Sequence, residues 1–226
     1  MLTPSPSRLQ RGLSLIEMMV GLTVGMIVVA GASLMMVGQL DDHRRLMLET
    51  QVQQDLRAAA DLVLRDMRRA GFNRRAEDGV SAPGAAAAKA NLYAMASLDK
   101  DGQLRYSYSR AKDEANEDGE VANNEEFGYR VRSKELQFRH GGNWQPLTDP
   151  KTLEITSFEP QLLVQRVKLD EFCQRPCPVG AVDCPPSMEV RELRLTLTGK
   201  AAHDARVVRS VTVSTRLRND AIEGGC

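Results

Sequence analysis

The sequence predicts an α+β protein in which one long N-terminal helix, transmembrane in its first half, packs in its second half on an antiparallel β-sheet. Three observations lead to this prediction. Residues 18–38 are all apolar or small except for Thr23 and Ser33. Residues 48–70 carry an apolar stripe with helical spacing, and the rest of the chain holds short alternating runs that are typical of strands.

The apolar run is long enough to cross a membrane. It comprises 21 residues, Met18 to Gly38, and about 20 such residues in a helix span the hydrocarbon core of a bilayer. The length disfavours a buried helix of a soluble protein. A plain membrane anchor remains an alternative, as does a secretory signal, because Ala30-Gly31-Ala32 resembles a small-residue cleavage site. Against the secretory signal, the apolar run continues through residues 34–37.

The charged segment after this run carries one apolar stripe. Seven residues recur at gaps of four and three: Leu48, Val52, Leu56, Ala59, Val63, Met67 and Ala70. This spacing places them on one face of a helix, and Gly71 is the expected end of that helix. We therefore expect one helix from Leu13 to Ala70, about 85 Å long at 1.5 Å per residue. The alternative, a soluble coiled coil, would have only about three heptads.

Strand patterns dominate the chain after a loop at residues 73–91. We predict strands at Leu92–Ala96, Leu104–Ser109, Phe127–Arg132, Glu135–Arg139 and Leu162–Leu169. The clearest pair comes last, where apolar residues alternate in residues 193–197 and again, with a threonine, in residues 211–217. These two runs flank Gly199–Ala205 and predict an antiparallel hairpin with one buried face.

Composition limits the classes of function. The 226 residues include 30 basic and 30 acidic side chains, so no bulk charge attracts nucleic acid, and we expect no nucleic-acid partner. The part after the first helix, about 150 residues, can bury the core of one domain. Aromatic residues make up only 4% of the chain, which predicts a mostly aliphatic core.

One carboxylate lies at the head of the apolar run. A short leader with Arg8 and Arg11 ends at Gly12, and Glu17 follows Leu13 by four residues. An ionised carboxylate in lipid costs about 2.5–3.5 kcal/mol, so such a residue usually has a partner or a function. Glu17 also lies near the positive end of the helix dipole once the leader is removed.

This arrangement resembles the class III signal of type IV prepilins, which consists of a basic leader that ends in a glycine, here Gly12, then a segment such as Leu13-Ser-Leu-Ile-Glu17 and an apolar helix. The resemblance implies that a prepilin peptidase cleaves between Gly12 and Leu13 on the cytoplasmic side and then methylates the new amine of Leu13. It also implies that Glu17 pairs with the terminal amine of a neighbouring subunit during assembly. Leu13 replaces the phenylalanine that is usual in the family, and the helix proline of major pilins is absent, which favours a minor pilin or a pseudopilin.

The four cysteines all lie in the C-terminal region: Cys173, Cys177, Cys184 and Cys226. An even number suits disulfides in an oxidising compartment. We expect two disulfides, one of which ties Cys226 to the segment Cys173–Cys184. Zinc is the alternative, but no histidine is near and the spacings fit no common ligand pattern. Two arginines lie on each side of the apolar run, so the distribution of positive charge does not predict its orientation in the membrane. The expected disulfides instead predict that the domain after the run is periplasmic.

Two acidic features resemble cation sites. Asp99, Asp101 and Gly102 match a fragment of a calcium loop but lack its downstream glutamate, so we expect a turn between two strands. The segment Asp113–Glu126 carries seven acids and no base, and we expect a solvated, mobile loop. We predict calcium at neither place.

No catalytic motif is present in the sequence. The histidines are scattered: His43, His140 and His203. There is no phosphate-binding glycine loop, no nucleophile elbow and no zinc-peptidase motif. We expect no enzyme, no cofactor and no metal, and regard the chain as a substrate of a peptidase.

The C-terminal half extends the resemblance. Four segments resemble, in order, the strands of PilW-type minor pilins and of the J-type pseudopilins of type II secretion: Phe127–Arg130, Lys134–Phe138, Trp144–Leu147 and Leu153–Phe158. The closing segments, Val190–Thr198 and Val211–Asn219, resemble the PilW ending. The implied organisation is a leader at 1–12, a transmembrane helix at 13–38, its periplasmic continuation at 39–71 and a sheet domain at 72–226.

The function implied is that of a minor pilin in the initiation or tip complex of a type IV pilus. It would be held in the inner membrane by a single span until assembly. The implied partners are the prepilin peptidase, other minor pilins, the major pilin and the inner-membrane assembly platform. A J-type pseudopilin of a type II secretion system is the nearest alternative, and a membrane-anchored periplasmic binding domain is the third.

Overall fold

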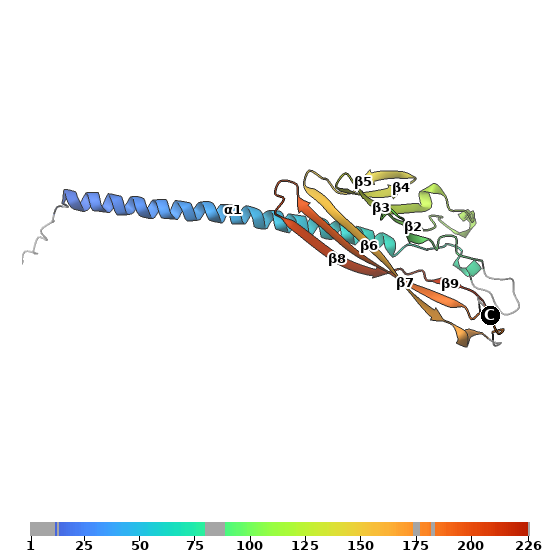
Figure 1. Cartoon of the computed structure of the whole chain (residues 1–226). Helices are drawn as coiled ribbons and strands as arrows, with labels where there is room; N and C mark the ends of the chain where they lie inside the picture. The colour runs from blue at the N-terminus through green and yellow to red at the C-terminus, as the bar shows by residue number, and fades with distance from the viewer. Residues whose placement is uncertain (1–11, 13, 80–88, 174–176, 182–183, 226) are drawn as a thin grey trace, which may run out of the picture. The chain divides into compact units, whose positions relative to one another are not determined.

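The computed structural model describes residues 12, 14–79, 89–173, 177–181 and 184–225. One long helix comes first, and antiparallel strands follow it (Figure 1). The chain divides into two compact units between Met47 and Leu48. The α+β fold with one long N-terminal helix on antiparallel sheets is confirmed.

The long helix α1 comprises Leu15–Met67. Arg69 and Ala70 donate their backbone N–H groups to carbonyls three positions earlier, so the helix tightens into turns before its predicted end at Ala70. Gly71 then has φ +79°, a left-handed conformation that favours glycine, which explains why the chain leaves the helix there. The other predicted end, Leu13, lies outside the described residues.

The strands of the described part of the chain form two antiparallel sheets, where we had predicted one. Sheet A has the order β1-β2-β3-β4-β5 and consists of β1 Ala96–Leu98, β2 Leu104–Ser107, β3 Glu126–Arg132, β4 Glu135–His140 and β5 Asn143–Pro146. Sheet B has the order β6-β7-β8, with β9 also on β7, and consists of β6 Leu153–Lys168, β7 Ser187–Ala201, β8 Val208–Arg216 and β9 Ala221–Glu223. Short 3-10 helices lie at η1 Ala76–Gly79, η2 Glu114–Asn116, η3 Asn123–Glu125 and η4 Asp170–Phe172.

The second half of α1 shares one hydrophobic core with both sheets. The predicted stripe forms its contribution: Val52, Leu56, Ala59, Val63, Met67 and Ala70 are buried, and Leu48 packs against the same core. In Figure 1 the strands of both sheets lie against this half of the helix. The amphipathic pattern therefore gave the packed face correctly.

The two sheets fill this core with different side chains. Sheet B contributes Leu193, Leu195 and Leu197, all fully buried, as an aliphatic core predicts. Sheet A and the loops at its edge instead bury all four tyrosines of the chain: Tyr93, Tyr106, Tyr108 and Tyr129. The core is mostly aliphatic, as predicted, but the low total of aromatic residues did not reveal that they gather on one sheet.

The aromatic side chains of sheet A stack on one another, and two of their hydroxyls donate hydrogen bonds to α1. Tyr108 stacks on Phe127 with ring centroids 4.2 Å apart. The carboxylate of Asp66, on the last turn of α1, accepts hydrogen bonds from the hydroxyls of Tyr106 at 3.2 Å and Tyr129 at 2.7 Å. The helix is therefore attached to sheet A by hydrogen bonds as well as by apolar contact.

The predicted C-terminal hairpin is confirmed. β7 pairs with β8 in the antiparallel register that places Leu195 opposite Val213. Gly199 lies where this hairpin, β6 and α1 crowd together. A Cβ at this position would come within 2.8 Å of the Leu153 side chain and 3.2 Å of the Leu56 side chain, so only glycine fits without a shift.

Two strand boundaries differ from prediction. Residues 92–95 form a turn rather than a strand, because Asn91 accepts the backbone N–H of Tyr93 and its side chain also donates to the Gly71 carbonyl. The strand predicted at Leu162–Leu169 is the end of β6, which is longer because a register shift between Ile155 and Ser157 lets it continue. Pro160 is tolerated there because β6 is an edge strand.

Candidate functional site

The N-terminal motif lies at the start of α1. Glu17 is in the first turn, and its Oε2 accepts the backbone N–H of Ser14 at 3.0 Å. Backbone N–H groups at a helix start have no partner within the helix, and a carboxylate there satisfies one of them near the positive end of the dipole. Gly12 is exposed, whereas the leader residues 1–11 and Leu13 lie outside the described residues.

The apolar part of α1 has the properties of a single-pass membrane anchor. Its large side chains from Leu15 to Val37 are between 54% and 77% exposed within the chain, and the span has a mean hydropathy of 2.2. Its hydroxyls are satisfied inside the helix, since Thr23 donates to the Met19 and Val20 carbonyls and Ser33 donates to the Val29 carbonyl. A span in lipid needs internal partners for its polar groups, and these residues have them.

Comparison with protein families agrees with this geometry. The prokaryotic N-terminal methylation motif matches residues 7–33. The family model of prepilin peptidase-dependent protein B matches residues 45–217, more than half of the chain. The chain belongs to the prepilin peptidase-dependent protein B family. These matches confirm the resemblance to prepilins. They also confirm the expectation of a pilin-like protein that depends on a prepilin peptidase.

These two families are of pilin-like structural proteins and not of enzymes. No curated protein and no solved structure matches the chain. The family match includes the second half of α1 and strands β1 to β8, so it extends well beyond the N-terminal motif.

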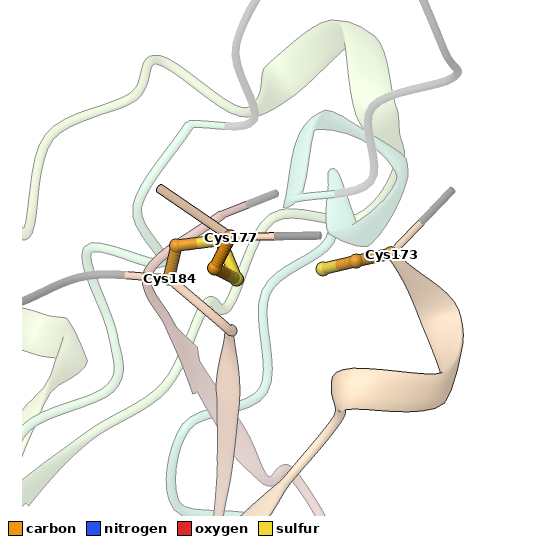
Figure 2. Close-up of side chains that lie close together, drawn as sticks. All are labelled: Cys173, Cys177 and Cys184. Atoms are coloured by element: carbon orange, nitrogen blue, oxygen red, sulfur yellow. A yellow bond between two sulfur atoms is a disulfide. The ribbon is translucent and has the colours of Figure 1, made fainter. Parts of the chain in front are cut away.

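Three of the four cysteines lie close together after the η4 helix: Cys173, Cys177 and Cys184. Cys177 and Cys184 form a disulfide, and Cys173 is also disulfide-bonded. Figure 2 shows the three side chains close together, and their sulfur atoms lie within 4.8 Å of one another. Cysteine sulfur binds zinc as a thiolate, and sulfurs joined in a disulfide are not thiolates. The disulfide between Cys177 and Cys184 therefore argues against the zinc alternative. Cys226 lies outside the described residues, and its pairing stays a prediction.

The acidic segment contains a site that sequence reasoning missed. The Tyr93 hydroxyl lies 2.7 Å from Glu117 Oε1 and 3.0 Å from Glu125 Oε2. All three side chains are buried. The Ser109 hydroxyl donates to the other oxygen of Glu117, and the backbone N–H of Arg110 donates to Glu125 Oε1 at 2.8 Å. The prediction of a solvated loop was therefore wrong for both glutamates.

Burial is the main cause that raises the pKa of Tyr93, and the two glutamates raise it further. The phenol therefore keeps its proton and acts as a donor between two carboxylates. The sequence does not distinguish these two glutamates from the other five acids of the segment Asp113–Glu126. Distance along the chain, 24 residues from Tyr93 to Glu117 and 32 to Glu125, hides the contact.

The remaining candidates have structural roles. Asp99 Oδ1 accepts the backbone N–H groups of Asp101 and Gln103, which forms the predicted turn between β1 and β2. His140 lies on β4 and stacks against Phe127 at 5.7 Å. His43 belongs to the first unit of the chain, and His203 belongs to the second.

Proposed function

We propose that the chain is a minor pilin that takes part in type IV pilus assembly, in the complex that initiates the pilus or forms its tip. The observation that supports this most is the single carboxylate of Glu17 at the head of an otherwise apolar span. A carboxylate is costly in lipid unless it finds a partner, and a neighbouring subunit can supply one. A J-type pseudopilin of a type II secretion system is the second candidate, because it uses the same motif and fold.

The first step of this function is processing. Prepilin peptidase cuts between Gly12 and Leu13 and methylates the amine of Leu13. Gly12 is exposed, and a Cβ at this position would have no atom of the described residues within 4 Å. A larger residue at position 12 therefore has room within the chain, so uncleaved precursor in a Gly12 variant reports on the peptidase and not on folding. An intact mass that begins at Ser33 would instead establish a secretory signal.

Cleavage changes the surroundings of Glu17. In the structure this carboxylate accepts an N–H from Ser14, one of the groups at the helix start. The processed chain gains a charged amine at Leu13, and Glu17 can pair with that amine of an adjacent subunit. Such a pair lowers the cost of both charges in lipid and sets the axial register between subunits.

The proposed organisation assigns a place to each part of the chain. The leader, residues 1–12, stays in the cytoplasm, residues 13–38 span the inner membrane, and residues 39–71 and 72–226 form the periplasmic helix and sheet domain. The disulfide between Cys177 and Cys184 supports the periplasm, because disulfides persist in oxidising compartments. The partners are other minor pilins, the major pilin and the inner-membrane assembly platform.

Deletion tests the proposal against its rival. A minor pilin of the initiation complex predicts fewer surface pili with an unchanged amount of major pilin. Complementation with the intact chain restores the pili, and the Gly12 variant provides a matched control that is made but not processed. Intact piliation together with a secreted hydrolase retained in the periplasm would assign the chain to type II secretion.

A further inference from the structure

We propose that the outer face of sheet A binds an acidic protein segment, held by Arg130 and Arg132 beside Trp144. This inference goes beyond the proposed function, because it concerns a surface of the sheet domain and holds for a minor pilin or a pseudopilin alike.

Strand register separates this face from the core. Leu104 pairs with Tyr129 and Phe138 with Tyr129 on the inner face. The alternate positions point the other way. They carry an unusual number of cations: Arg105 on β2, Arg130 and Arg132 on β3 and Arg139 on β4, with Gly128, Gln137 and Trp144 among them.

Two of these arginines have carboxylate partners within the chain. Arg139 lies 2.8 Å from Glu126, and Arg105 lies 3.7 Å from Asp99. These pairs are local, and neither of them includes Arg130 or Arg132.

Arg130 and Arg132 have no carboxylate partner in the described part of the chain. Arg130 donates its Nε to Gln137 at 2.9 Å, and Arg132 is exposed. Glu135 lies opposite Arg132 in the register and adds one negative charge to this face; one of its carboxylate oxygens accepts a hydrogen bond from Gln137, and it makes no ion pair with Arg132. Burial lowers the pKa of Arg130 most, and the charges of Arg132 and Arg105 lower it further, as expected for like charges that lie together.

The chain's single tryptophan forms a platform for Arg130. The Arg130 guanidinium lies 4.1 Å from the centre of the Trp144 ring. Gly128 lies beside the indole, and a Cβ there would come within 2.7 Å of the Leu104 carbonyl oxygen, so this position favours glycine. Stacking and the bond to Gln137 hold the guanidinium in one orientation, which reduces the entropy lost when a ligand binds.

The chemistry of this face fits carboxylates on an extended chain. Guanidinium groups bind carboxylates through paired hydrogen bonds. Arg130 and Arg132 are two residues apart on one strand face, about 7 Å, which is the spacing of alternate side chains in an extended peptide. Single-stranded nucleic acid needs free aromatic faces for its bases, but Arg130 already covers one face of Trp144. The observations therefore favour an acidic protein segment.

Trp144 supplies the readout, because it is the only tryptophan in the chain. The full-length protein in detergent is titrated with a synthetic peptide of alternating glutamate and serine, and with the matched glutamine–serine peptide. We expect a saturable change in Trp144 fluorescence with the acidic peptide only, weakened by salt. Anisotropy of the labelled peptide should show about tenfold weaker binding to the R130Q/R132Q variant.

The matched control removes two exposed arginines elsewhere, R194Q/R218Q, and changes the net charge equally. Its affinity should stay within about twofold of the unmodified chain. The single variant R132Q alters only an exposed side chain, so it keeps the test valid if the double variant fails to fold. Equal losses in R132Q and the control variant, or no binding of the acidic peptide, would overturn the proposal. Tighter binding of an oligothymidylate than of the peptide would overturn it in favour of nucleic acid.

Discussion

The two halves of α1 share one helical backbone but differ in how their apolar side chains are distributed around it. In the first half, the large apolar side chains from Leu15 to Val37 are all exposed within the chain. In the second half, the buried apolar side chains lie on one face of the helix, and Leu56, Val63 and Met67 on that face are fully buried. A uniformly apolar helix has no preferred face and suits lipid or other helices, whereas a striped one needs a protein core. One helix can therefore serve two environments through the distribution of its side chains alone.

The largest effect should come from the buried stripe. We expect Leu56→Ala to lower the free energy of unfolding of the sheet domain by about 2–5 kcal/mol, because it opens a cavity between α1 and Gly199. Urea denaturation of the full chain in detergent measures this. Leu22→Ala is the matched control in the apolar half and should leave the transition unchanged. A similar loss of stability in both variants would contradict the view that only the second half of α1 stabilises the sheet domain.

Removal of the disulfide should have a somewhat smaller effect. Replacing Cys177 and Cys184 with serine opens a loop with a sequence separation of 7 and should cost about 2–3 kcal/mol in the chain-entropy model. The measurement is urea denaturation with and without reductant. Reductant should lower the stability of the unmodified chain, and an unchanged midpoint would show that the bridge does not contribute.

Hydrogen bonds between α1 and sheet A should contribute less again. Asp66→Ala leaves the buried hydroxyls of Tyr106 and Tyr129 without their acceptor, with an expected cost of about 1–3 kcal/mol. Asp61→Ala, an exposed carboxylate on the same helix, should be nearly neutral. Equal stability of these two variants would show that the tyrosines find other partners.

The same tyrosines predict a loss of stability at high pH. Burial raises the pKa of Tyr106 and Tyr129, and Asp66 raises both further. A raised pKa in the folded state means that their stabilisation is complete below the unfolded value of about 10 and is lost as the pH rises above it. Unfolding followed from neutral to alkaline pH should show this decline, which Y129F should reduce. A flat profile would place these hydroxyls in contact with solvent.

Glu17→Val should have the smallest effect on stability and a large one on assembly. Glu17 lies in the other unit from the sheets, and its loss removes a charge from lipid, so the unfolding midpoint should not change. Leader cleavage should continue, but co-purification with the other minor pilins should weaken. The conservative variant Glu17→Asp is the control for charge. Normal piliation with Glu17→Val would exclude a role for this carboxylate in assembly.

Periodicity and turn residues in the sequence correctly predicted the features of the fold that depend on neighbouring residues. The stripe from Leu48 to Ala70, the end at Gly71 and the β7–β8 hairpin follow from periodicity and turn residues, and all three are present. The division into two sheets was not predictable, because alternation along β5 and β6 does not say which neighbour each strand chooses. The candidate site divides in the same way. Glu17 is visible in the sequence as an isolated charge, whereas the partners of Tyr93 are set by distant segments that the fold brings together.

The Tyr93 cluster also predicts how the acidic segment responds to a protease. Its hydroxyl meets carboxylates 24 and 32 residues further along the chain, so this contact ties the acidic segment to a residue that is distant in the sequence. Such a contact restricts the freedom of the intervening chain. We therefore expect a protease to cleave the acidic segment faster in Y93F, which lacks the hydroxyl, than in the unmodified chain.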